Sequence, residues 1–86
     1  MKTGTWVMTR GIAAKIKEDR KFAEFVYESI GKYVRQDWGD TCEEDSKLND
    51  SAVKNSDSRI VAKYDNIFII TEWDRSVTTV LFTEEY

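Results

Sequence analysis

The chain has 86 residues, of which 41% are hydrophobic and 13% aromatic, so it can bury one small core and is not a disordered tail. Its formal net charge is −3, and without a large basic patch this argues against direct binding to nucleic-acid phosphate. Residues 1–20 hold no apolar run of signal-peptide length, no segment approaches the roughly 20 apolar residues of a membrane-spanning helix, and the one cysteine cannot form an intramolecular disulfide. We therefore expect a single domain over residues 1–86 that is cytoplasmic and has no membrane partner.

The charge is unevenly distributed along the chain. Residues 1–35 carry eight Lys and Arg against four Asp and Glu, a net +4, whereas residues 36–57 carry two against seven, a net −5. Residues 58–86 carry three against five. An acidic surface of this kind favours basic protein partners, including the nucleic-acid-binding grooves of other proteins.

The first third predicts a strand followed by helices. Residues 5–9 (TWVMT) are β-branched and aromatic, which predicts a short strand that stops before Gly11. Ile12 and Ile16 fit one or two helical turns, after which the Asp19 carboxylate can cap a longer helix by accepting free backbone N–H groups. The apolar side chains of that longer helix follow one stripe: Phe22, Phe25, Val26, Ile30, Tyr33 and Val34.

The segment 36–45 (QDWGDTCEED) predicts a joint between two helices. Gly39 can adopt the left-handed conformation that ends the first helix. Thr41 and Glu44 have the spacing of a capping box, in which the Thr41 hydroxyl accepts from the Glu44 N–H and the Glu44 side chain accepts from the Thr41 N–H. A second, mostly polar helix is then expected on the surface, over about residues 42–53.

The last third alternates as an antiparallel meander. A two-residue turn at Asp65 and Asn66 joins the alternating segments 60–64 and 67–73. A turn near residues 74–76 then leads to a third strand over residues 77–82.

The register of this third strand stays open from the sequence. A two-residue turn puts Thr78, Val80 and Phe82 on the same face as Ile67, and a three-residue turn puts Val77, Thr79 and Leu81 there. The expected fold is α+β in the order β-α-α-β-β-β: a three-stranded antiparallel meander, a possible N-terminal strand, and two helices packed on one face.

Few residues in the chain are suited to catalysis. There is no histidine, so a Cys–His nucleophile pair and the commonest metal ligand are missing, and the glycines are isolated and form no phosphate-binding loop. Carboxylates can bind Mg²⁺ or Ca²⁺, but those of residues 37–50 do not have the spacing of an EF-hand loop. We expect no cofactor, no metal site and no enzymatic activity.

The acidic residues from 37 to 50 have two interpretations that the sequence leaves open. Around a helix start, exposed carboxylates are each stabilising by about 0.3–1 kcal/mol and need no partner. Alternatively they form a partner-binding face with Trp38 as its aromatic anchor, although a tryptophan at such a joint is more often a core residue. The candidate partner-binding residues are Asp37, Trp38, Asp40, Glu43, Glu44, Asp45 and Asp50. Helix capping alone gives Asp37, Trp38 and Asp45 no structural role, and Cys42 is expected to be a small, partly buried apolar residue.

Several short strings together carry a resemblance to a known family. They are TRGI (9–12), DWGD (37–40), EED (43–45), ND (49–50), ITE-x-DRS (70–76), TTVLF (78–82) and E-x-Y (84–86). In this order they resemble a family of small proteins encoded on plasmids, phages and integrative elements of bacteria, some of which are linked to restriction–modification loci. The family typically has proline after TTVLF, where this chain has Thr83. It has no established catalytic residues, so the resemblance assigns none here.

The resemblance implies a function by its genomic setting, because small acidic proteins of mobile elements often inhibit host defence. We expect a non-catalytic inhibitor of a host defence protein, anti-CRISPR-like or anti-restriction, that presents its acidic face to a basic nucleic-acid-binding surface. The alternative is a regulatory or accessory protein of the element itself that acts as a homodimeric interaction module. The sequence leaves open whether the protein is a monomer or a homodimer.

Overall fold

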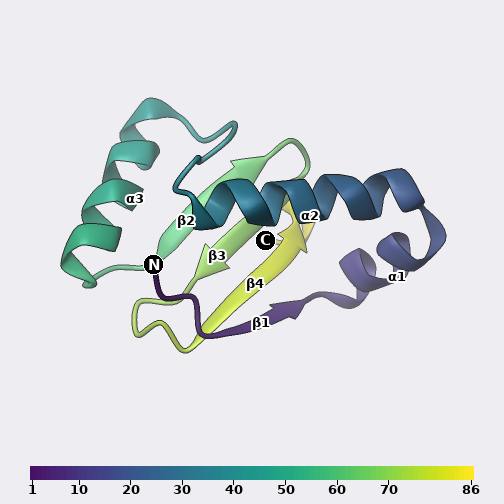
Figure 1. Cartoon of the computed structure of the whole chain (residues 1–86), viewed down its shortest axis with the longest axis horizontal. Helices are drawn as coiled ribbons and strands as arrows, with labels where there is room; N and C mark the ends of the chain where they lie inside the picture. The colour runs from purple at the N-terminus through teal and green to yellow at the C-terminus, as the bar shows by residue number, and fades with distance from the viewer.

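The computed structural model describes residues 1–86 and confirms the α+β class (Figure 1). In chain order the elements are β1 (Thr5–Met8), α1 (Arg10–Glu18), α2 (Arg20–Val34), α3 (Glu43–Asn55), β2 (Ile60–Tyr64), β3 (Ile67–Thr71), β4 (Val77–Phe82) and the 3₁₀ turn η1 (Thr83–Glu85). None of the helices is both long and apolar enough to cross a lipid bilayer.

One helix more is present than expected, because the turns after β1 form the nine-residue helix α1. The Thr9 hydroxyl caps α1 by accepting from the Ile12 N–H at 3.3 Å. Asp19 ends α1 and begins α2, since its carboxylate accepts from the Phe22 N–H at 3.1 Å, as predicted. A single aspartate is therefore the C-cap of one helix and the N-cap of the next.

The four strands form one sheet in the order β1-β4-β3-β2. β2, β3 and β4 are the antiparallel meander that the sequence predicts, and β1 pairs with β4 in parallel at the far edge. The Glu72 N–H donates to the Val77 carbonyl at 3.0 Å, which leaves the four residues 73–76 in the connecting loop. Because this number is even, Thr78, Val80 and Phe82 share the face of Ile67, as the two-residue alternative also required.

Helix α2 packs its predicted stripe against one face of the sheet (Figure 1). Phe22, Val26 and Tyr33 are buried, whereas Val34 at the end of the stripe is 46% exposed. The Tyr33 hydroxyl is bonded to the Thr71 hydroxyl at 2.7 Å, and Thr71 to Thr78 at 2.7 Å, so the polar atoms inside this layer are paired with one another. Burial raises the pKa of Tyr33 to about 12.

Helix α3 packs against the same core as α2 through Ala52, but it lies at the edge of the sheet and not across its face as α2 does. It runs along the outer edge of β2, at the end of the sheet away from α1 (Figure 1). Only Asn49 and Ala52 of α3 are buried, and such a narrow strip cannot cover a sheet face. The Arg75 guanidinium holds the end of α3 to the β3–β4 loop, because it donates to the carbonyls of Ala52 at 2.7 Å and of Glu72 at 3.2 Å.

Candidate functional site

The candidate residues all lie in one stretch, residues 37–50, which we call the acidic segment. It comprises the connection from α2 to α3 and the first two turns of α3. Trp38 is 6% exposed and the six carboxylates are exposed. The structure thus brings the predicted residues together but gives them different roles.

Trp38 is a core residue and not an exposed anchor, which corrects its place in the candidate face. Its ring meets the ring of Tyr33 edge-on, with the ring centroids 5.5 Å apart. Its indole N–H donates to the Asp50 carboxylate at 2.8 Å. Asp50 therefore satisfies a polar atom at the border of the core, as a buried indole requires.

The chain between α2 and α3 is not the capped helix joint that the sequence predicts. α2 ends one turn earlier, with Gln36 in the left-handed conformation (φ 64°). Gly39 is also left-handed (φ 61°), but it lies beside Lys63 of β2, and a Cβ there would sit 2.4 Å from the Tyr64 ring. Glycine is required at this position because the Tyr64 ring packs against its backbone.

The prediction of a capping box formed by Thr41 and Glu44 is also wrong. Cys42 is the N-cap of α3 and makes no side-chain cap bond. The Thr41 hydroxyl instead donates to the Trp38 carbonyl at 2.6 Å and accepts from the Lys63 N–H at 2.8 Å. Cys42 itself is exposed, contrary to the expectation of partial burial.

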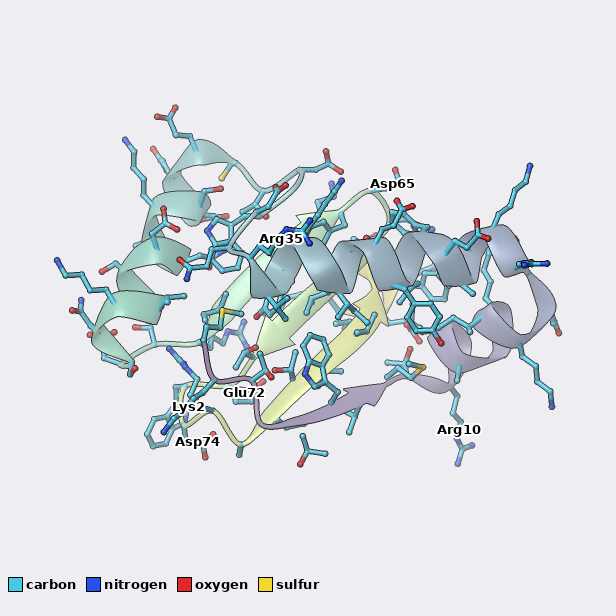
Figure 2. The ribbon with its side chains drawn as sticks, viewed as in Figure 1. Lys2, Arg10, Arg35, Asp65, Glu72 and Asp74 are labelled. Carbon is cyan, nitrogen blue, oxygen red and sulfur yellow. The ribbon has the colours of Figure 1, made fainter.

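Together these groups close the outer edge of β2. The Asp40 N–H donates to the Lys63 carbonyl at 2.8 Å, and the Asp40 carboxylate accepts from the Asp65 N–H at 2.7 Å. Asp65 lies in the turn between β2 and β3 (Figure 2). Further along, the Asn49 amide accepts from the Val61 N–H at 3.2 Å and donates to the Val61 carbonyl at 2.8 Å. Backbone and side-chain groups of residues 39–49 thus take the place of a neighbouring strand.

Asp37 stabilises the same connection through two contacts. Its carbonyl accepts from the Tyr64 hydroxyl at 2.7 Å, and its carboxylate accepts from the Gly39 N–H at 3.1 Å. Burial, more than the nearby Asp37 carboxylate, raises the pKa of Tyr64 well above its usual range. Asp37 therefore has the structural role that the sequence did not reveal.

Three carboxylates remain in the first turn of α3: Glu43, Glu44 and Asp45. Glu43 makes an exposed pair with Lys47 at 3.4 Å, the kind of i,i+4 contact that is worth about 0.3–0.5 kcal/mol. All three also lie at the positive end of the helix, where negative charge is stabilising. None of the three makes a hydrogen bond that holds β2 or the core, unlike Asp37, Asp40 and Asp50.

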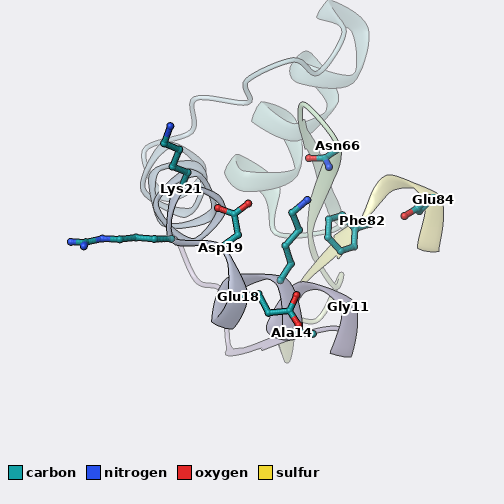
Figure 3. A pocket seen from close by; sticks show the side chains of 10 residues that line it. Gly11, Ala14, Glu18, Asp19, Lys21, Asn66, Phe82 and Glu84 are labelled. Atoms are coloured by element: carbon teal, nitrogen blue, oxygen red, sulfur yellow. The ribbon is translucent and has the colours of Figure 1, made fainter.

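Two surface features elsewhere were not found from the sequence. The larger is an open hollow of about 800 Å³ at the α1–α2 joint, where Lys15 and Lys21 lie near Glu18, Asp19 and Glu84 (Figure 3). The smaller is an apolar groove of about 240 Å³, lined by Trp6, Val7, Met8, Ile30 and Val80, between α2 and the edge strand β1. Since it joins residues of β1, α2 and β4, only the tertiary fold reveals it.

No arrangement for metal binding is present, since no three His, Cys, Asp or Glu side chains are grouped in a way that could hold a metal ion. All buried side-chain nitrogen and oxygen atoms have hydrogen-bond partners. A comparison with protein-family models, curated proteins and solved structures finds no match. The resemblance to proteins of mobile elements therefore stays a prediction.

Proposed function

We propose that this protein is a non-catalytic inhibitor that binds a host defence protein, anti-CRISPR-like or anti-restriction, through the first turn of α3. The observation that supports the proposal is the row of exposed carboxylates at Glu43, Glu44 and Asp45, next to Asp37 and Asp40. A basic groove that normally holds nucleic-acid phosphate is the complementary surface.

The carboxylates are held on a fixed base, which favours binding over a purely solubilising role. Asn49 fastens α3 to β2, and Arg75 fastens its other end to the β3–β4 loop. Charges on a rigid helix lose little conformational freedom on binding, so more of their attraction contributes to affinity. Asp37, Asp40 and Asp50 add negative potential while they hold the fold.

The choice of a defence protein as the target depends on the resemblance to proteins of mobile elements, which the chain carries in strings such as DWGD and EED. The charge distribution of the molecule fits that choice. The acidic segment lies at one end, whereas the α1–α2 joint at the other end combines Lys15, Arg20 and Lys21 with Glu18, Asp19 and Glu84 (Figures 1 and 3). The excess of negative charge therefore attracts a basic target toward α3.

The test is the binding of the purified protein to CRISPR effectors and restriction enzymes, measured with the triple variant Glu43→Lys, Glu44→Lys, Asp45→Lys. These three positions are preferred because Asp40 and Asp50 carry structural hydrogen bonds. The matched control is Glu18→Lys, Glu24→Lys, Glu28→Lys, which changes the net charge equally on α1 and α2. We expect only the first variant to lose binding, and a loss that is equal in both would contradict a specific acidic face.

A second function, a homodimeric accessory module of the mobile element, is supported by a separate observation: the outer edge of β1 is open. Binding to a defence protein distinguishes the two functions, since the inhibitor requires it and the accessory module does not.

A further inference from the structure

One edge of the sheet is covered and the other is open. The β2 edge is closed by Asp40, Thr41 and Asn49, whereas no strand lies outside β1. The N–H groups of Thr5 and Thr9 donate to the carbonyls of Ser76 and Val80, each at 3.1 Å, so the odd-numbered residues face β4. Because backbone groups alternate along a strand, the N–H and C=O groups of Trp6 and Met8 point outward and are available for pairing.

β1 also lacks the features that usually protect an edge strand. Its sequence TWVM contains no charge, no proline and no bulge, and Val7 and Met8 are 42% and 41% exposed. Soluble proteins commonly block such edges with lysine, proline or a covering segment, as this chain does at β2. An uncharged, unblocked edge is a template for another strand.

The groove between this edge and α2 is apolar as well. Ile30 of α2 lines the groove beside Trp6 and Met8, and the other two lining residues are Val7 and Val80. None of the five is charged. The open edge of β1 and this groove adjoin each other through Trp6, Val7 and Met8, and together we call them the β1 surface.

We propose that the β1 surface binds a second copy of this chain, with the two β1 strands paired antiparallel about a two-fold axis at Val7. This inference does not depend on the proposed inhibition of a defence protein. In this register Trp6 of each copy lies opposite Met8 of the other, and the outward backbone groups form four hydrogen bonds. The result is a continuous sheet of eight strands.

Charge selects a second copy as the occupant. A two-fold axis brings each surface against itself, so a charged surface repels its own copy. The first turn of α3 carries three carboxylates, so two copies that met there would oppose like charges. The β1 surface contains no charged residue, so two copies can meet there without like charges opposed.

The central residue provides the test, because Val7 of one copy faces Val7 of the other. We expect sedimentation equilibrium under reducing conditions, which exclude a disulfide through the exposed Cys42, to show twice the chain mass of 10.0 kDa. Val7→Lys and Val7→Glu should each weaken the dimer at least about 10-fold, because like charges are then opposed. The mixture of Val7→Lys with Val7→Glu should restore dimers, because opposite charges then meet across the axis.

The control is Leu48→Lys, an equal change at a residue of α3 that is 67% exposed, and circular dichroism of each variant checks that the fold is retained. A wild-type protein that stays monomeric at all concentrations would overturn the proposal, including the case in which the edge instead binds a strand of another protein. Dimers that Val7→Lys leaves intact, or that the mixture of the two charged variants does not restore, would overturn it equally.

Discussion

The side-chain amide of Asn49 bonds both backbone groups of Val61, accepting from the N–H at 3.2 Å and donating to the carbonyl at 2.8 Å. An amide side chain has the same donor and acceptor as a peptide group, so Asn49 pairs with β2 as a neighbouring strand would. A helix that buries few apolar residues is thereby fixed to the sheet.

Replacing Asn49 should therefore destabilise the protein more than its small area suggests. Asn49→Ala leaves the N–H and the carbonyl of Val61 without their partner, and we expect a loss of about 1–3 kcal/mol in the free energy of unfolding. Asn49→Asp keeps the acceptor and loses the donor, so it should also be destabilising. Urea unfolding measures both, with the exposed Asn55→Ala as control. Equal stability of Asn49→Ala and Asn55→Ala would show that the pairing contributes nothing.

Replacing Asp50 should destabilise the protein more than replacing Asp45, although both are exposed acidic residues of α3. Asp50→Ala removes the acceptor of the Trp38 indole and should cost about 1 kcal/mol in unfolding free energy. Asp45 makes no side-chain hydrogen bond to the core, so Asp45→Ala should cost only the small helix-end term, at most about 1 kcal/mol and usually less. Thermal unfolding of the two variants is the measurement, and a greater loss for Asp45→Ala would contradict these roles.

Two glycine-to-alanine changes should have opposite signs. Gly39→Ala puts a Cβ 2.4 Å from the Tyr64 ring at a left-handed residue, so we expect it to destabilise by more than about 1 kcal/mol. Gly31 lies inside α2, where a Cβ would meet only the flexible Arg35 side chain at 3.3 Å. Gly31→Ala should therefore stabilise by roughly 0.5–1 kcal/mol. Denaturant midpoints of the two variants decide, and a stable Gly39→Ala protein would refute the packing of residues 39–41 on β2.

Stability should fall in alkaline solution through Tyr33. Its pKa is raised from 10.0 to about 12 in the folded state because the hydroxyl is buried. The folded protein then holds this proton more tightly than the unfolded chain. The contribution is complete below about pH 10 and is lost as the pH rises toward 12, at up to about 1.4 kcal/mol per pH unit. Tyr33→Phe cannot titrate, so unfolding free energies from about pH 9 to about pH 11.5 should fall less steeply for it than for the wild type. Parallel slopes would contradict the assignment to Tyr33.

The parts of the fold that depend on neighbouring residues were predicted well. Asp19 caps α2 because the N–H groups it accepts lie within three residues. The turn at Asp65 and Asn66 fixes the β2–β3 register, since an alternating pattern on both sides leaves one pairing. In each case the partner is close along the chain, so local chemistry suffices.

The errors arose where a distant partner competes for a local group. Thr41 has the spacing of a capping residue, yet its hydroxyl bonds the Lys63 N–H at the sheet edge, 22 residues away. Gly39 has the position of a helix stop, yet glycine is required there because the Tyr64 ring packs against its backbone. Trp38 and the groove beside β1 depend likewise on contacts that only the folded chain creates. For the acidic segment, the sequence located the residues but could not separate those that hold β2 from those that remain free.

The central claim is that the chain closes one edge of its sheet and leaves the other open for a second copy. Amide hydrogen exchange, followed residue by residue at several protein concentrations, tests it most directly. The N–H groups of Val61, Lys63 and Asp65 should be protected at every concentration, because Asn49, Thr41 and Asp40 accept from them. Those of Trp6 and Met8 should exchange fast in dilute protein and slowly when it is concentrated. Fast exchange at β2, or exchange at Trp6 and Met8 that does not depend on concentration, would contradict the account.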